Sequence, residues 1–148
     1  MELTIDQALQ DGITAHKEGK LQEAEKLYRA ILQSQPQHPD ANHNRGVLAL
    51  SLNENKLAIS LFANALKSNP NIMQFWISLI KAYIRLNKYN EAYKSLMEAS
   101  RYHGEHDALL ELGQEIDKHK KCNENQKEFR DSIQYKILCL LEKEQYSQ

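Results

Sequence analysis

The sequence predicts an all-α protein, and three observations lead to that prediction. Glycine and proline are scarce, with 5 and 3 residues among 148, well below the turn density of a small β-sandwich or barrel. Alanine, leucine, glutamate, lysine and glutamine, which favour helices, are abundant. The residue pattern also recurs at an offset of 34 positions, a period typical of stacked helical units. A chain of this length therefore reads as one domain built as a repeat array.

The composition excludes several classes of function. With 19 basic and 20 acidic residues, the net charge of −1 gives no field that would recruit nucleic acid. The most apolar stretches, residues 75–80 and 137–141, are too short to cross a bilayer, and the first residues are acidic where an export leader is basic. Cys122 and Cys139 are too few for a disulfide framework or a thiolate metal site. We therefore expect a cytoplasmic protein with no membrane contact, no metal and no cofactor.

The repeat is defined by columns of small and large residues. The small column is Ala24, Ala58 and Ala92, and four positions later each copy carries a large apolar residue, namely Tyr28, Phe62 and Leu96. Gly12 recurs as Gly46, and Pro36 recurs as Pro70. We interpret the small residues as sites where two antiparallel helices approach closely, with Gly12 facing Ala24 and Gly46 facing Ala58.

Apolar spacing within each copy is helical, and short polar turns divide it into two runs. The predicted helices span residues 4–18, 21–34, 39–52, 55–68, 73–86, 89–102 and 107–120. Glycine or asparagine, both tolerant of the left-handed conformation, stands between the helices of each hairpin at Gly19, Asn53 and Asn87. Repeats at about 5–38, 39–72 and 73–106 are thus followed by a partial fourth at 107–121.

An eighth helix is predicted within residues 122–148, after a polar break at 121–125. Asn125 and Glu128 have capping-box spacing ahead of its apolar residues, which include Phe129, Ile133, Ile137, Leu140 and Leu141. Its wide apolar arc leaves three roles open: capping the end of the array, pairing with a second copy into a homo-oligomer, or docking another partner or domain.

At this point the sequence resembles the tetratricopeptide repeat (TPR) family. The resemblance rests on Gly12, Ala15, Gly19, Ala24, Tyr28 and Pro36 in the first copy, on Gly46, Ala49, Ala58, Phe62, Ala65 and Pro70 in the second, and on Trp76, Leu79, Tyr83, Tyr89, Ala92 and Ala99 in the third. It implies a right-handed solenoid of helical hairpins. Asn42, Ile80 and Gly104 depart from the family pattern, and we expect looser packing at these positions. The linker at 35–41 is also similar to TPR arrays that precede bacterial glycosyltransferase or sulfotransferase domains.

In such a solenoid the first helix of each hairpin lines a concave groove, so first-helix residues outside the packing columns are candidates for contact with a ligand. They combine an apolar strip that includes Leu9, Ile13, Val47, Ile77 and Ile84 with polar and basic neighbours. The candidate groove residues are Gln10, Ile13, Lys17, His43, Asn44, Val47, Ser51, Ile77, Ser78, Lys81 and Arg85. Gln10, Asn44 and Ser78, spaced by 34, would form a ladder able to hold peptide backbone.

The sequence contains no phosphate-binding loop, nucleophile elbow or paired carboxylates, so we predict no catalytic residues. The function we predict is a non-catalytic protein-protein interaction module that binds a peptide or helix of a partner protein. Two alternatives remain: the array is the recruiting arm of a larger transferase, or it is a self-associating structural scaffold.

Overall fold

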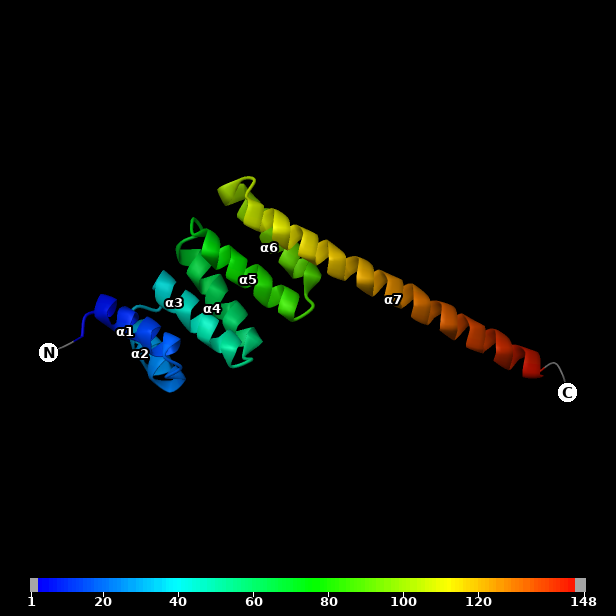
Figure 1. Ribbon diagram of the computed structural model, residues 1–148, viewed down its shortest axis with the longest axis horizontal. Helices are drawn as coiled ribbons and strands as arrows, with labels where there is room; N and C mark the ends of the chain where they lie inside the picture. The colour runs from blue at the N-terminus through cyan, green and yellow to red at the C-terminus, as the bar shows by residue number, and fades with distance from the viewer. Residues whose placement is uncertain (1–2, 146–148) are drawn as a thin grey trace.

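The computed structural model describes the backbone of residues 3–145 and the side chains of residues 3–124, 127 and 131. Seven helices and no strand occur in this backbone, which agrees with the predicted all-α class. They are α1 (Ile5–Lys17), α2 (Leu21–Ser34), α3 (Pro39–Ser51), α4 (Asn55–Ser68), α5 (Met73–Arg85), α6 (Tyr89–His103) and α7 (Asp107–Gln145). The first six form three stacked antiparallel hairpins, and α7 packs against α5 and α6 (Figure 1).

The hairpin turns form where the sequence places residues that tolerate positive φ. Gly19 has φ 77°, Asn53 has φ 61° and Asn87 has φ 57°. The left-handed conformation lets the chain leave one helix and enter the next after a few residues. This is why the first helix ends and the second begins within one residue of the predicted bounds in all three hairpins.

Close approach within a hairpin involves a glycine and an aromatic ring. A Cβ added to Gly12 would lie 2.7 Å from Cε1 of Tyr28, and one added to Gly46 would lie 2.6 Å from Cε1 of Phe62. The prediction that these glycines face Ala24 and Ala58 is therefore wrong, because the ring four residues further along the second helix fills the space that the missing side chain leaves. Both rings are fully buried.

Boundaries between repeats are fixed by two equivalent hydrogen bonds. Nε1 of Trp76 donates to the carbonyl oxygen of Pro70 at 2.8 Å, and Nδ2 of Asn42 donates to that of Pro36 at 3.0 Å. Asn42 also donates to the carbonyl oxygen of His38 and is only 1% exposed. The expected looseness at Asn42 is not observed, because a buried amide here makes the same bond as the indole.

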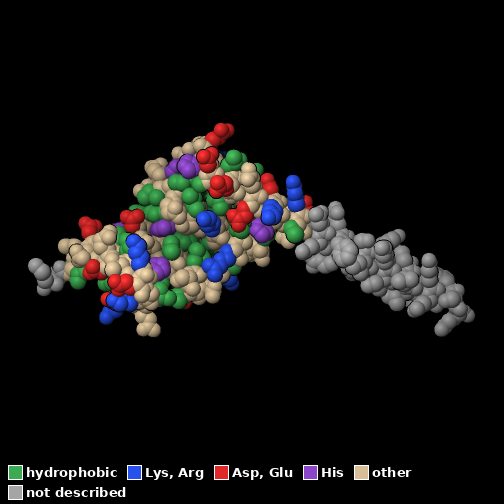
Figure 2. Space-filling view, in the orientation of Figure 1, with side chains coloured by type: hydrophobic (Ala, Val, Ile, Leu, Met, Phe, Trp, Pro, Cys, Tyr) green, Lys and Arg blue, Asp and Glu red, His purple; other side chains and the backbone are tan. Residues whose placement is uncertain are grey.

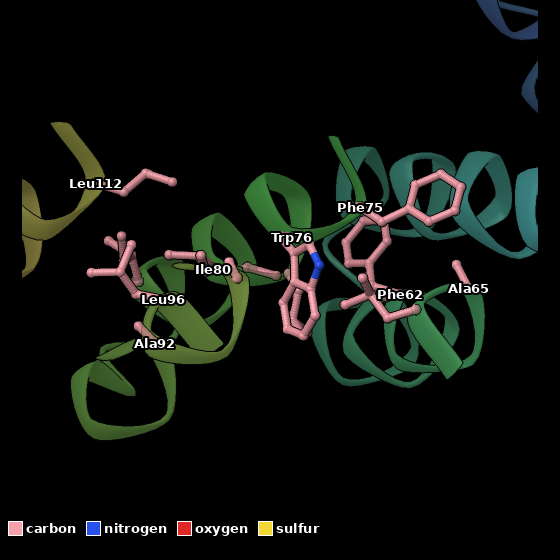
Figure 3. Packing of buried hydrophobic residues seen from close by; sticks show 14 of the residues in the cluster. Phe62, Ala65, Phe75, Trp76, Ile80, Ala92, Leu96 and Leu112 are labelled. Carbon is pink, nitrogen blue, oxygen red and sulfur yellow. The ribbon is translucent and has the colours of Figure 1, made fainter. Parts of the chain in front are cut away.

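The core consists of two clusters of buried residues, and the partly buried Leu32 packs against both. One cluster of buried apolar residues joins α1, α2 and α3, and a second extends from α3 to α7. In Figure 3, Phe62 and Phe75 lie beside Trp76, and Ile80, Leu96 and Leu112 continue the packing into α6 and α7. Ile80 stands where the family has a small residue. It is fully buried, so the looser packing expected at this position is not observed.

The predicted break at residues 121–125 is wrong, because α7 runs as one helix of 39 residues. The segment contains no glycine or proline, so nothing in it is costly for a helix interior. In Figure 1, α7 continues past the hairpins and away from them. In the described part of the chain, no helix is both long and apolar enough to span a membrane.

Candidate functional site

The first helices of the hairpins lie side by side and form one face of the array. Helix α1 contacts α3, α3 contacts α5, and α5 contacts α7, whereas each second helix contacts the first helices of its own and the next repeat. This arrangement follows from the repeat, since each hairpin places the same first-helix positions in the same orientation. The helices that carry the predicted groove residues, α1, α3 and α5, are therefore neighbours.

The apolar strip of this groove is narrower than predicted. Ile13 on α1, Val47 on α3 and Ile77 on α5 are half-buried and supply one apolar side chain from each helix. Leu9 and Ile84, which were predicted to extend the strip, are both buried, each 8% exposed, and belong to the core. Three half-buried apolar side chains, one from each first helix, remain of the predicted strip.

A hydrogen bond between two predicted groove residues joins α3 and α5. Nε2 of His43 lies 2.9 Å from Oγ of Ser78, and Nε2 of Gln74 donates to the same hydroxyl at 3.4 Å. Ser78 is only 8% exposed. Because its hydroxyl already has two partners, Ser78 links neighbouring repeats instead of offering a free rung of the predicted polar ladder.

The imidazole of His43 lies in an aromatic environment. Its ring stacks on Phe75 with 4.7 Å between centroids and lies 5.5 Å from the ring of Phe62. Burial lowers the pKa of His43 below its usual 6.5, and the negative charge of Asp40 opposes this only in part. His43 is therefore neutral at physiological pH, and its ring contributes an apolar surface to the groove.

The other two rungs of the ladder differ from Ser78. Asn44 is half-buried, and its Nδ2 donates to the carbonyl oxygen of Asp40 in the same helix at 2.8 Å. Its Oδ1 is left to accept from a ligand amide. Gln10 is exposed on α1. The spacing of 34 thus brings Gln10, Asn44 and Ser78 to one face but gives them unequal access to a ligand.

Polar residues at the far end of the groove hold the repeats together. Arg85 donates to the carbonyl oxygen of Leu50 at 3.2 Å and to Oδ1 of Asn53 at 2.7 Å, across the boundary between the second and third hairpins. Ser51 donates to the carbonyl oxygen of Leu48 at 2.6 Å. The guanidinium of Arg85 stays exposed while it makes these bonds, so it supplies positive charge at a fixed place.

Lys17 on α1 and Lys81 on α5 complete the set and are exposed. With Arg85 they give the groove three basic groups beside its apolar strip. Figure 2 shows basic, acidic, histidine and hydrophobic side chains interspersed over the hairpins.

Two residues of this face were missed from the sequence. Phe75 supports the ring of His43, and Asn53 fixes Arg85. Contacts across repeats join positions separated by 32 or 35 residues, not 34, because neighbouring helices are offset when they cross. A search for pairs one or two positions off the period would have found them.

The predicted association residues, Phe129, Ile133, Ile137, Leu140 and Leu141, have side chains that lie outside the described residues. Their backbone belongs to α7. Among the side chains that the structure describes, no three histidine, cysteine, aspartate or glutamate residues gather closely enough to hold a metal ion.

A family model described as "Tetratricopeptide repeat" matches residues 10–71 and 43–103. A curated relative, the human protein O-mannosyl-transferase TMTC3, is 34% identical over 77 residues, which is 52% of this chain and 8% of that protein. The chain therefore spans less than a tenth of this relative's length.

Solved structures share the fold. The Hsp90 co-chaperone Cns1 from Saccharomyces cerevisiae matches 86% of this chain and 43% of its own with a TM-score of 0.78 and 22% identity. The TPR2B domain of yeast Sti1, solved as a complex with pHsp70, matches 79% of this chain and 96% of its own with a TM-score of 0.69 and 21% identity.

Proposed function

Because the chain belongs to the tetratricopeptide repeat family, we propose that it is a non-catalytic module that binds a peptide or helix of a partner protein in its concave groove. Protein-protein interaction is typical of this fold, and the yeast Sti1 domain was solved in such a complex. The proposal concerns which face of this chain binds and which chemistry it selects. We place this activity in the cytoplasm, where the two isolated cysteines stay reduced.

One observation carries the proposal. Ile13, Val47 and Ile77 come from three successive first helices that contact one another in order, and all three are half-buried. A partner helix or extended peptide needs apolar anchors in a row, and burial of each anchor contributes about 1.5–3 kcal/mol when complete. The ring of His43, held between Phe62 and Phe75, lines the same face and widens the apolar surface.

The charges beside the strip favour an acidic ligand. Lys17, Lys81 and Arg85 are exposed on the groove helices, and Arg85 is held in place by Leu50 and Asn53. A fixed guanidinium loses little side-chain entropy when it meets a carboxylate. We therefore infer a ligand with apolar residues at helical or alternate spacing and at least one acidic residue near them.

A peptide selected from a displayed library against the full chain provides the probe. The groove variant is Lys81→Glu, and its matched control is Lys56→Glu, an equal charge reversal at an exposed position of the second helix α4. Fluorescence anisotropy should show at least tenfold weaker binding to Lys81→Glu, because an attraction to an acidic residue becomes a repulsion. Lys56→Glu should bind like the unmodified chain.

Circular dichroism of both variants checks the fold, which exposed charge reversals should leave intact. Equal affinity of Lys81→Glu and Lys56→Glu for the peptide would contradict groove binding. Weakening by Lys56→Glu alone would move the binding face to the second helices.

A second candidate function is favoured by the similarity to TMTC3. The match covers about half of this chain. In that case the array is the recruiting arm of a larger transferase and the groove binds the protein to be modified. Intact mass spectrometry of the native protein tests this, because a mass equal to the 17.2 kDa of this chain would exclude an attached transferase.

A further inference from the structure

A cavity of about 780 Å³ opens between α6 and α7. Its apolar lining includes Leu96, Leu109, Leu110 and Gly113, and Leu110 is 64% exposed. In each preceding hairpin the first helix packs against a second helix, whereas α7 continues straight past the array (Figure 1). The cavity therefore lies where the fourth repeat lacks its second helix.

The glycine in this cavity differs from its counterparts. Gly12 and Gly46 are buried under the rings of Tyr28 and Phe62, each 16 positions later in the sequence. Gly113 is only half-buried. The residue 16 positions after Gly113 is Phe129. The sequence thus keeps the glycine-aromatic pair of a complete fourth hairpin, although α7 places the two residues on one continuous helix.

The helix stays straight because the turn residue is missing. The three hairpin turns use Gly19, Asn53 and Asn87, each with positive φ. In the third hairpin the position of Gly12 and Gly46 is held by Ile80, and Gly113 stands 33 residues after Ile80. The same shift from the turn residue Asn87 leads to Lys120, which is therefore the turn position of the fourth repeat. Lysine has neither the freedom of glycine nor the short polar side chain of asparagine, and the left-handed conformation costs it about 1–2 kcal/mol. As long as α7 is straight, Phe129 cannot reach Gly113 of its own chain.

We propose that residues 122–136 of a second copy fill this cavity, in a dimer in which the two α7 helices exchange the missing second helix. The exchange is reciprocal, so Phe129 of each copy packs on Gly113 of the other. Within the hairpins, the residue midway between the glycine and its ring lies at the turn, residue 20 in the first and 54 in the second. The corresponding midpoint of Gly113 and Phe129 is residue 121, which places the twofold axis there.

Charge agrees with this register at one end of the cavity. The wall of the cavity carries Glu105, Asp107 and Asp117. Residues 122–136 carry three basic residues, Lys127, Arg130 and Lys136, and three acidic ones, Glu124, Glu128 and Asp131. In antiparallel helices with their midpoint at residue 121, Lys136 of the second copy lies level with His106, between Glu105 and Asp107. A basic side chain thus meets two acidic ones at that end.

Light scattering coupled to gel filtration of the full chain tests the proposal. The expected mass is twice the 17.2 kDa of one chain. Phe129→Ala should shift the mass to that of one chain, because it removes the ring that fills the cavity. The matched control is Tyr146→Ala, which truncates an aromatic residue outside residues 122–136 and should leave the dimer intact.

A second variant keeps the proposal falsifiable if Phe129→Ala disturbs the fold. Lys120→Gly supplies the missing turn, so residues 122–136 should fold back onto their own cavity and give a monomer with unchanged helical content. A monomeric unmodified chain would overturn the proposal, and so would a dimer that survives both Phe129→Ala and Lys120→Gly. Loss of the dimer in Tyr146→Ala but not in Phe129→Ala would also overturn it, since it would place the contact outside residues 122–136.

Discussion

Nδ2 of Asn42 donates a 3.0 Å hydrogen bond to the carbonyl oxygen of Pro36 and so closes the boundary between the first two repeats. The indole of Trp76 closes the next boundary through the carbonyl oxygen of Pro70. A small amide and a large aromatic residue are thus interchangeable at this position for the hydrogen bond, though not for the volume that they fill. The boundary depends on a buried donor that is directed at the prolyl carbonyl.

Replacing Asn42 should therefore be costly. Asn42→Ala removes the donor to Pro36 and to His38 and should lower the free energy of unfolding by about 1–3 kcal/mol. Asn42→Asp should cost more, because a buried carboxylate cannot donate. Urea denaturation followed by circular dichroism measures both. Asn64→Ala, at an exposed position of α4, is the control and should change stability little. An Asn42→Ala chain as stable as this control would contradict the role of the bond.

The glycine-aromatic pair predicts a specific rescue. Gly46→Ala places a Cβ 2.6 Å from Cε1 of the buried ring of Phe62 and should lower the free energy of unfolding by about 1 kcal/mol net of the gain in helix propensity. In the third hairpin the positions equivalent to Gly46 and Phe62 hold Ile80 and Leu96, so a larger residue in the first helix is paired with a smaller one in the second. The double variant Gly46→Ala, Phe62→Leu should therefore lose less than the sum of the two single variants. Additive losses in a double-mutant cycle would show that the two positions do not interact.

Asn53 offers a test of the turn conformation. Asn53→Gly and Asn53→Ala both remove the acceptor for Arg85, so the difference between them reports the backbone alone. Because φ is 61° at this position, the alanine variant should be about 1 kcal/mol less stable than the glycine variant. Thermal unfolding of the two proteins measures the difference. Equal midpoints would contradict a left-handed residue in the turn.

The burial of His43 predicts a pH dependence. Burial lowers the pKa of His43 in the folded chain below 6.5, so the unfolded chain takes up a proton at higher pH than the folded chain does. Stability is therefore complete above about pH 6.5 and is lost as the pH falls through that value toward the folded pKa. Urea denaturation between pH 7.5 and pH 5.5, values on either side of about 6.5, should show a smaller fall in His43→Gln than in the unmodified chain. Parallel pH profiles of the two chains would count against this account.

Much of the fold could be predicted from the sequence because the same turn and packing residues recur in each of the three repeats. Three turns carry glycine or asparagine, and all three members of the small column are alanine, so the helices of the hairpins follow within a residue or two. The continuation of α7 was missed because Asn125 and Glu128 imitate a helix start. The informative signal was Lys120, which stands where the other turns have Gly19, Asn53 or Asn87.

The candidate groove was predicted as a face but not as a set of contacts. A period of 34 selects the positions that share an orientation, which is why Ile13 and Val47 lie on one surface. It does not give the offset between neighbouring helices, so the link from His43 to Ser78 could not be predicted. That link buries Ser78, which the sequence alone would assign to the ligand.

Nuclear magnetic resonance tests the central claim most directly. Titration of the isotope-labelled full chain with the selected peptide should shift the amide signals of the groove residues Ile13, Val47, Ile77 and Lys81, with small changes on the second helices α2 and α4. This result would place the ligand on the concave face. Shifts that cluster on α2 and α4 while those four residues stay unchanged would contradict the account.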